Sequence, residues 1–203
     1  MSKINAKSYG TSFEQDIKKS AEKQSVLFER FKDSNKFSFN KDNITRFTPN
    51  NPCDGFFFYK GILTYVELKS THGNITFNQP IEVQEKGKAK PMIKTSQVLD
   101  LLKRSKYKDV VCGLIIRFEN IDKKTEISNP YIGFVEINDF VKWTKKCNKK
   151  SMNVNEFKQI SLKIEYKQPK VSYIYNLEKM LETIKKANDI KVLRMLNKNI
   201  DNK

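Results

Sequence analysis

The segment 51–69 constrains the fold most, because it predicts a β-hairpin. An aromatic run and a run of apolar and β-branched residues flank Lys60-Gly61, which is a weaker turn signal than Asn-Gly. Counting outward from a two-residue turn at Lys60-Gly61 places Asp54 opposite Glu67. Directly opposed residues of antiparallel strands share one face, with Cβ atoms about 4.5–5.5 Å apart. The sequence therefore predicts that the hairpin brings two carboxylates together.

The same face also carries Lys69, because residues two apart in a strand point the same way. Two opposed carboxylates repel, and a hard divalent cation such as Mg²⁺ or Mn²⁺ removes the repulsion because it prefers carboxylate oxygens. Lys69 beside it could orient or deprotonate a water, which indicates a hydrolytic site for a phosphodiester. Local pattern leaves an alternative, in which Glu67 and Lys69 pair on an exposed strand and Asp54 is a turn residue.

The charge of the chain favours a polyanionic partner. Lys and Arg number 39 against 23 Asp and Glu, which gives a net charge of +16. A charge of this size favours nucleic acid over a membrane as partner. No apolar run approaches the roughly 20 residues of a spanning helix, and the polar start is not typical of a secretory signal. We therefore expect a cytoplasmic protein that binds nucleic acid.

Cysteine and histidine usage narrows the chemistry. The three cysteines are odd in number and far apart, as in a protein with reduced thiols and no disulfide framework. His72 is the only histidine, so a histidine-based zinc site or a Ser-His-Asp triad has almost no material.

The order of expected elements is helix, hairpin, helix, strand, strand, helix, which predicts an α/β fold with the hairpin central in a mixed sheet flanked by helices. We expect one domain over residues 1–203, since no boundary or internal repeat is evident. The expected elements are a helix opening at Gly10–Ser12 with an apolar stripe from Phe13 to Phe31, a helix from Thr95, strands at 110–116 and 131–137, a helix capped by Asn138 or Asp139, a helical turn at 155–159, extended residues at 160–174, and an amphipathic helix from Leu177 with a second one capped by Asn188-Asp189.

Several segments keep two interpretations. Glu14 follows Thr11 by three residues and Gln15 follows Ser12, so a capping box fits either register, and the first-turn carboxylate of Glu14 could also point into a metal site. Residues 32–53 predict a loop or a short strand pair. The lysine-bearing stretch 78–94 predicts a mobile surface loop, either a solvated insertion or a flap that contacts DNA. The helical tail from Leu177 either packs on the domain or serves as a dimer contact.

These residues together resemble the PD-(D/E)xK nuclease superfamily, and more narrowly the RecU family of Holliday junction resolvases from Gram-positive bacteria and their phages. The resemblance covers residues 10–181, with 182–203 as a helical extension. Its matching pieces are Gly10-x-x-Phe13-Glu14, Asp54-Gly55, Tyr59-Lys60-Gly61, Glu67-x-Lys69, Ser70-Thr71, Phe77, Gln97, Tyr131–Val135 with Trp143, Ile160–Leu162 and Pro169–Ile174.

The resemblance implies a PD-(D/E)xK (restriction-endonuclease-like) core and a homodimer that places two active sites on opposing strands of a four-way junction. It also implies dependence on Mg²⁺, with Mn²⁺ as a substitute and no small-molecule cofactor. Segment 32–53 is shorter than the stalk with which the family reaches into the junction, and residues 78–94 are an insertion relative to the family.

The expected function is a Mg²⁺-dependent endonuclease that resolves Holliday junctions and other branched DNA. Asp54 and Glu67 would bind the metal, with the Leu68 carbonyl as a further ligand, and Lys69 would position the attacking water or steady the phosphate. Glu14 and Gln97 would contact the metal or the water. The alternatives are a restriction-like or end-processing nuclease of the same superfamily, and a DNA-binding protein without catalysis.

Overall fold

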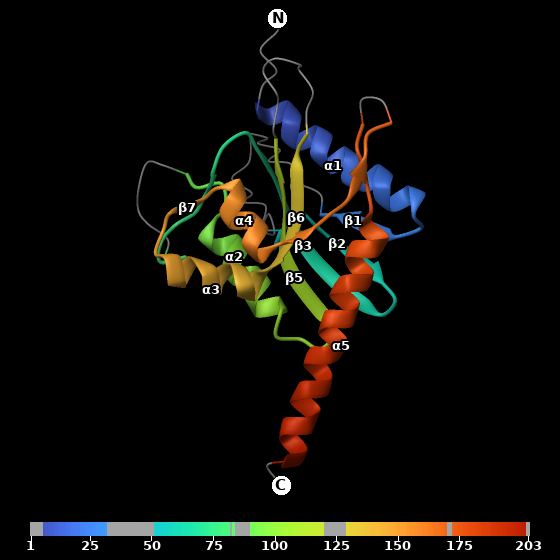
Figure 1. Cartoon of the computed structure of the whole chain (residues 1–203), viewed down its shortest axis with the longest axis vertical. Helices are drawn as coiled ribbons and strands as arrows, with labels where there is room; N and C mark the ends of the chain where they lie inside the picture. The colour runs from blue at the N-terminus through green and yellow to red at the C-terminus, as the bar shows by residue number, and fades with distance from the viewer. Residues whose placement is uncertain are drawn as a thin grey trace, which may run out of the picture.

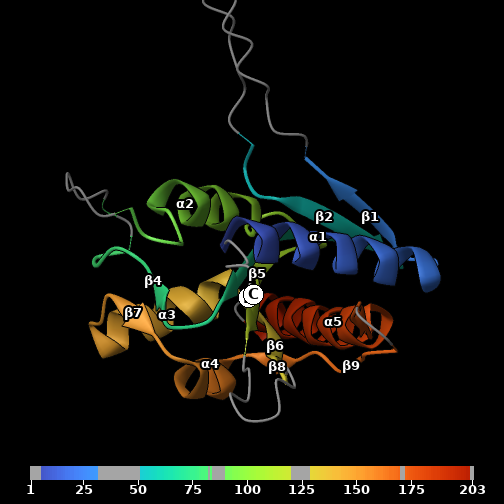
Figure 2. The ribbon, with the colours of Figure 1, turned by 90° about the horizontal axis from the view of Figure 1, so that it is seen from above.

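The chain folds into a mixed β-sheet with helices on both faces, as the order of elements predicts. The computed structural model describes residues 6–31, 51–81, 83, 90–119, 129–169 and 172–201. In Figure 1 the strands lie at the centre of the body and α5 runs down past their lower end. Seen from above in Figure 2, α2 and α3 lie on one side of the sheet and α1 and α5 on the other. The α/β prediction is therefore confirmed at the level of a mixed sheet flanked by helices.

The main sheet has six strands in the order β1-β2-β3-β5-β6-β8. Only the β3–β5 pair is parallel, because α2 carries the chain back between them; the other neighbours are antiparallel. Two short pairs, β4 with β7 and β9 with β10, lie outside this sheet. The strands are β1 Leu27–Arg30, β2 Gly55–Tyr59, β3 Ile62–Thr71, β4 Ile75–Thr76, β5 Val110–Phe118, β6 Tyr131–Glu136, β7 Ser151–Met152, β8 Leu162–Lys163, β9 Tyr166–Lys167 and β10 Ile174–Tyr175. The helices are α1 Ala6–Lys23, α2 Thr95–Arg104, α3 Ile137–Cys147, α4 Val154–Ile160 and α5 Leu177–Asp201.

The hairpin of β2 and β3 has the predicted register. Tyr59 pairs with Ile62, and the ladder continues to Gly55 opposite Val66, one step before Asp54 and Glu67. The turn at Lys60-Gly61 has positive φ at both residues, 47° and 84°. Two left-handed residues are the type I′ arrangement, whose twist matches that of the flanking strands. The turn geometry therefore fixes which side chains share a face.

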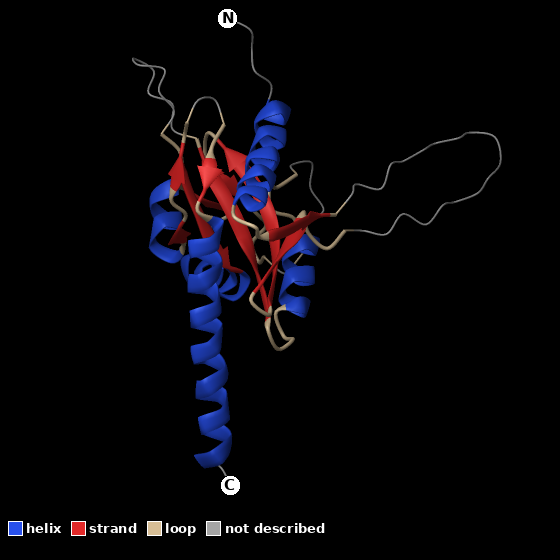
Figure 3. Ribbon diagram, turned by 90° about the vertical axis from the view of Figure 1, so that its right-hand side faces the viewer, coloured by secondary structure: helices blue, strands red, loops and turns tan. Residues whose placement is uncertain are grey.

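Two apolar cores lie on the two faces of the sheet. One contains Phe13 and Ile17 of α1 with Ile115 of the sheet. The other contains Val98 of α2 and Phe140 of α3. The central strand β5 carries side chains into both cores, as its continuously apolar sequence predicts. Figure 3 shows the sheet from the side that α1 and α5 cover, with the helix beside the N label and the long helix that ends at C in front of the red strands.

The first helix differs from the prediction at both ends. It begins at Ala6, so Thr11 and Glu14 lie within it and the predicted capping box at its start is wrong. It ends at Lys23, because Ser25 adopts a left-handed backbone with φ of 54°. Val26 N–H then bonds to Ala21 C=O at 3.0 Å and Ser25 N–H to Glu22 C=O at 3.3 Å, which is a Schellman motif. The predicted apolar stripe therefore stops short of Phe28 and Phe31, and strand β1 takes its place.

Segment 78–94 is anchored in the core at both ends, so the predicted mobile surface loop is wrong there. Ile81 and Ile93 are fully buried. Gln79 donates a hydrogen bond to the Thr144 carbonyl at 2.6 Å, and Asn78 donates to Thr95 Oγ1 at 3.1 Å. Residues 82 and 84–89, and almost all of segment 32–53, lie outside the described residues.

Two predicted helix boundaries are also wrong. Helix α3 begins at Ile137 with Glu136 as N-cap, and the amide of Asn138 donates instead to Ser105 Oγ at 3.4 Å. Helix α5 continues through Asn188-Asp189 to Asp201, without the predicted second start. An ion pair between Lys185 and Asp189 at 3.1 Å, four residues apart, supports the helix across this point.

Candidate active site

The predicted site lies on the face of the sheet that α2 covers. Asp54 precedes β2, and one of its oxygens, Oδ2, accepts a hydrogen bond from the backbone N–H of Leu68 at 2.7 Å. This bond joins the aspartate, which precedes β2, to β3, the other strand of the hairpin and the one that carries Glu67. The structure thus brings together the two acidic positions that the hairpin register predicts.

Glu67 is a buried carboxylate with an uneven set of partners. Its side chain is fully buried in the sheet. Oxygen Oε1 accepts hydrogen bonds from both Lys69 Nζ and Gln97 Nε2. The other oxygen, Oε2, is buried and has no hydrogen-bond donor among the described residues. A buried oxygen without a donor costs free energy, which a proton, a water or a cation at Oε2 would offset.

The electrostatics of Glu67 follow from this placement. Burial raises the pKa of the Glu67 carboxyl to about 7, the Lys69 ammonium partly offsets that rise, and the nearby Asp54 carboxyl adds to it through charge and hydrogen bonding. A carboxyl that shares its site with a second carboxyl binds a proton more tightly. A divalent cation would replace that proton, because it neutralises both acids at once.

Helix α2 supplies Gln97, the fourth side chain of the cluster. Gln97 lies at the third position of the helix, and its carbonyl oxygen accepts a hydrogen bond from the Lys94 backbone N–H at 2.9 Å. Its amide nitrogen points the other way, to Glu67. The residue therefore caps the helix and fixes the carboxylate with opposite ends of one amide group.

Glu14 and the Leu68 side chain lie outside the cluster just described, although the Leu68 backbone N–H bonds to Asp54. Glu14 forms an ion pair with Arg30 at 2.8 Å, on the strand that pairs with β2. Its role in catalysis stays a prediction. Leu68 turns its side chain into the core formed with α1 and pairs along the backbone with Ile115. Its carbonyl as a metal ligand also stays a prediction.

Cys53 precedes Asp54 and is one of the free thiols that cysteine usage predicts. Burial raises the pKa of the Cys53 thiol to about 12. The thiol donates to the Gly55 carbonyl at 3.2 Å, so it supports the start of the strand. At neutral pH the thiol is protonated and uncharged, so it does not compete with the carboxylates for a cation.

A second buried charge cluster lies on the opposite face of β3 and was missed by the sequence analysis. Its centre is Arg117, 2% exposed, which pairs with Glu119 at 2.5 Å and with Asp16 at 3.4 Å. Its guanidinium also donates to Ser70 Oγ at 3.4 Å, directly after Lys69 in the chain. The signal that could have found it is an arginine near the end of an otherwise apolar strand.

The chain was compared with known proteins. No protein-family model matches it. It is 29% identical over 197 residues to the SPbeta prophage-derived uncharacterized protein YotM of Bacillus subtilis (strain 168), and the match covers 90% of each chain. Within the described ranges, no helix combines the length and the apolarity that crossing a bilayer requires. The chain is thus similar, over nearly its whole length, to a protein carried by a prophage.

Proposed function

We propose that this protein is a Mg²⁺-dependent endodeoxyribonuclease with a PD-(D/E)xK core that cuts branched DNA, four-way junctions above all. The observation that carries the proposal is the state of Glu67. It is a buried carboxylate with one oxygen held by Lys69 and Gln97, the other without a donor among the described residues, and a second carboxyl, Asp54, close by.

The donor set fits a hard divalent cation. Carboxylate oxygens are the ligands that Mg²⁺ and Mn²⁺ prefer, and Mg²⁺ is commonly bound through one or two carboxylates and keeps several waters. Asp54 and Glu67 would hold the ion, with the Leu68 carbonyl as a further ligand. When bound, the ion neutralises charge that builds up on the phosphate and lowers the pKa of a coordinated water.

The remaining work falls to the side chains around Glu67. The reaction adds water across a P–O bond: the water oxygen bonds to phosphorus, the bond to the leaving sugar oxygen breaks, and that oxygen takes up a proton. Lys69, whose side chain is 19% exposed, pairs with Glu67 and would orient the water or steady the phosphate. Gln97 would keep the carboxylate in one orientation throughout, because its own position is fixed by the helix cap.

Branched DNA is the proposed substrate for reasons of charge and resemblance. The net charge of +16 supports binding through phosphates, which depends strongly on salt and little on base sequence. The motifs shared with RecU-type resolvases support a homodimer that cuts opposing strands of a junction. The prophage origin of the relative supports an action in the cytoplasm of a bacterium, as a phage-encoded or bacterial protein.

Cleavage of three labelled DNAs in Mg²⁺ tests the proposal: a synthetic four-way junction, a linear duplex of the same sequence, and a flap. We expect the junction to be cut fastest, and the Asp54→Asn variant to bind it without cutting. Equal rates on all three would leave a nuclease but remove the resolvase, in favour of a restriction-like or end-processing enzyme. Binding without cutting by the parent protein would leave a non-catalytic DNA-binding protein.

A further inference from the structure

A polar hollow of about 640 Å³ lies beyond the end of β3, outside the cluster around Glu67. Its walls come from segments far apart in the chain: the turn after β3, the ends of β5 and β6 that meet there, the first turn of α4, and the β8–β9 region. Side chains that bind polyanions and stack on rings line it. They include His72, Asn129, Tyr131, Lys158, Lys163 and Tyr166.

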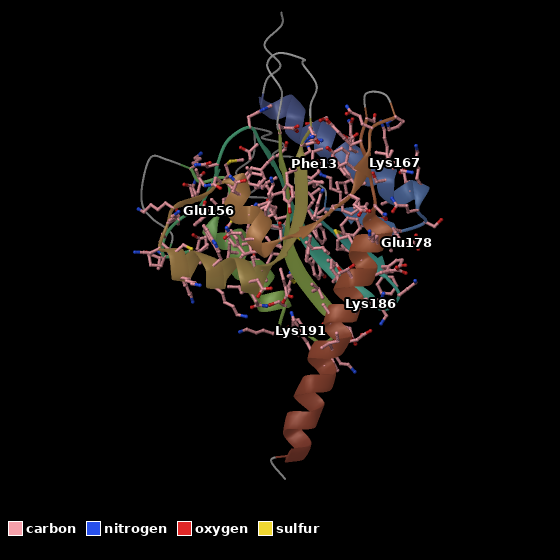
Figure 4. The ribbon with its side chains drawn as sticks, viewed as in Figure 1. Phe13, Glu156, Lys167, Glu178, Lys186 and Lys191 are labelled. Carbon is pink, nitrogen blue, oxygen red and sulfur yellow. The ribbon has the colours of Figure 1, made fainter. Side chains whose placement is uncertain are left out.

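The two lysines of the hollow carry positive charge. Lys158 and Lys163 are exposed, and neither has a carboxylate within ion-pair distance in the part of the chain that the structure describes. The neighbouring carboxylates are each taken by another cation. These pairs are Glu119 with Arg117 at 2.5 Å, Glu156 with Lys149 at 2.5 Å, and Glu165 with Lys179 at 2.9 Å. Glu156, on α4, is labelled in Figure 4. The hollow therefore presents positive charge to the solvent.

Two tyrosine rings form part of the walls. Lys158 Nζ lies 5.3 Å from the centre of the Tyr131 ring, and the Tyr131 hydroxyl is hydrogen-bonded to Ser161 Oγ at 3.0 Å. The Tyr166 hydroxyl donates to Asn129 Oδ1 at 2.8 Å. Because the hydroxyls are fixed, the rings are held in place before any ligand arrives. Both tyrosine side chains remain partly exposed beside the hollow.

The hollow lies within reach of the candidate active site. Lys69 and His72 are three residues apart, which is roughly 10 Å along a strand at about 3.3 Å per residue. The parallel strands β3 and β5 end together, with Thr71 opposite Phe118, so this edge of the sheet leads from Glu67 directly to the hollow. A nucleic-acid strand with a phosphate at Lys69 would pass the hollow within the next few nucleotides.

We infer that this hollow binds unpaired nucleotides of a DNA strand adjoining the phosphate that is cut, with Lys158 and Lys163 on phosphates and the tyrosine rings stacked on bases. The inference rests on the proposed function and deepens it, because it states how the site would prefer a branch point, where base pairs can open, over continuous duplex. Aromatic rings in a basic groove are the usual means of binding single strands, since unpaired bases expose their faces. Bases inside a duplex are already stacked and cannot enter such a hollow.

Binding of a fluorescent oligothymidine in EDTA tests the inference without any cutting. The variant is Lys158→Ala with Lys163→Ala. The matched control is Lys106→Ala with Lys108→Ala, which removes two exposed lysines from the turn at the other end of β5. We expect at least tenfold weaker binding for the first pair and less than twofold for the second. For the Lys158→Ala/Lys163→Ala variant, the slope of log K against log salt concentration should become shallower by about 0.7 per lost phosphate contact.

A crosslinking experiment gives the second readout. An oligonucleotide with 5-iodouracil, irradiated on the parent protein, should crosslink to Tyr131 or Tyr166. Equal losses for both lysine pairs, or crosslinks only at other residues, would overturn the inference. If the Lys158→Ala/Lys163→Ala variant cuts junctions and binds oligothymidine as the parent does, the inference about the hollow is wrong and the proposed nuclease function stands. If the first lysine pair alone weakens oligothymidine binding but the parent protein cuts no DNA, the inference about the hollow stands and the proposed nuclease function is wrong.

Discussion

Gln97 donates a hydrogen bond to Glu67, and that bond joins helix α2 to strand β3 inside the candidate site. It uses the same carboxylate oxygen as Lys69. The glutamate is therefore held by two donors on one side and left with a bare oxygen on the other, within the described structure. An enzyme that binds a metal through Glu67 would need this orientation to be kept when the metal is absent.

Replacement of Gln97 by alanine should slow Mg²⁺-dependent cutting about tenfold or more, because the carboxylate loses one of its two donors. The helix also loses its cap, at a cost of about 1 kcal/mol in unfolding free energy. Cutting rates at saturating Mg²⁺ measure the first effect and urea unfolding the second. Glu156→Ala is the control, since Glu156 caps α4 in the same way without touching Glu67. Equal loss of cutting in the control would show that helix stability, not the donor, is responsible.

The Asp54→Asn variant should keep its fold and its DNA binding while cutting falls about a thousandfold. Asparagine can still accept the hydrogen bond from the Leu68 N–H, so the hairpin is preserved. The variant loses one of the two negatively charged ligands of the metal, and with it several kcal/mol of charge stabilisation. A factor of ten in rate corresponds to about 1.4 kcal/mol. Junction binding and cutting are measured on the same preparation. The exposed Asp139→Asn serves as control, and undiminished cutting by Asp54→Asn would end the metal assignment.

Lys69→Ala should also abolish cutting with little effect on junction binding. One lysine among many contributes little to the total affinity for DNA. Beside Glu67, however, no other cationic side chain in the described structure could take over its role. The expected measurement is single-turnover cutting against binding, with the exposed Lys103→Ala as control. Retained cutting would mean that Lys69 is only a surface charge paired with Glu67.

Stability of the metal-free protein should fall as pH rises from about 5 to 8. Burial raises the pKa of Glu67 from its ordinary 4.5 to about 7, so within that window the folded protein keeps a proton that the unfolded chain releases. The folded state binds more protons than the unfolded chain, so the free energy of unfolding decreases as pH rises, by about 1–3 kcal/mol. Unfolding in EDTA at both pH values measures it. Glu67→Gln should make the unfolding free energy depend less on pH. Mg²⁺ should restore stability to the parent protein at pH 8 but not change it at pH 5. A parent protein as stable at pH 8 as at pH 5 would contradict the burial of this acid.

The hairpin and the meeting of Asp54 with Glu67 could be predicted, because a two-residue turn fixes the register and the register fixes the face. The end of α1 could not. Phe28 and Phe31 continue the helical spacing, and the break comes from a left-handed serine, Ser25, which carries no strong sequence signal. Gln97 could be placed in a first turn, but its contact with Glu67 depends on how α2 packs across the sheet.

The anchoring of segment 78–94 shows the same limit. Lysines in its middle predict a solvated loop, and the few apolar residues at its ends decide the outcome. Ile81 and Ile93 are buried against the helices on the α2 face, among residues such as Phe140. Whether a lone isoleucine in a polar stretch is buried depends on a cavity that other parts of the chain form, so spacing within the segment does not reveal it.

The Arg117 cluster gives the strongest prediction on stability. Arg117→Met should lower the unfolding free energy by about 3–5 kcal/mol, because it leaves the buried carboxylates of Asp16 and Glu119 without their shared cation. Urea unfolding measures the loss. The matched control is Lys18→Met, which removes an ion pair with Glu22 whose side chains are 68% and 63% exposed and should cost about 0–0.5 kcal/mol. A cost for Arg117→Met as small as that of the control would mean that water reaches the cluster in solution, and its ion pairs would then contribute no more than surface pairs do.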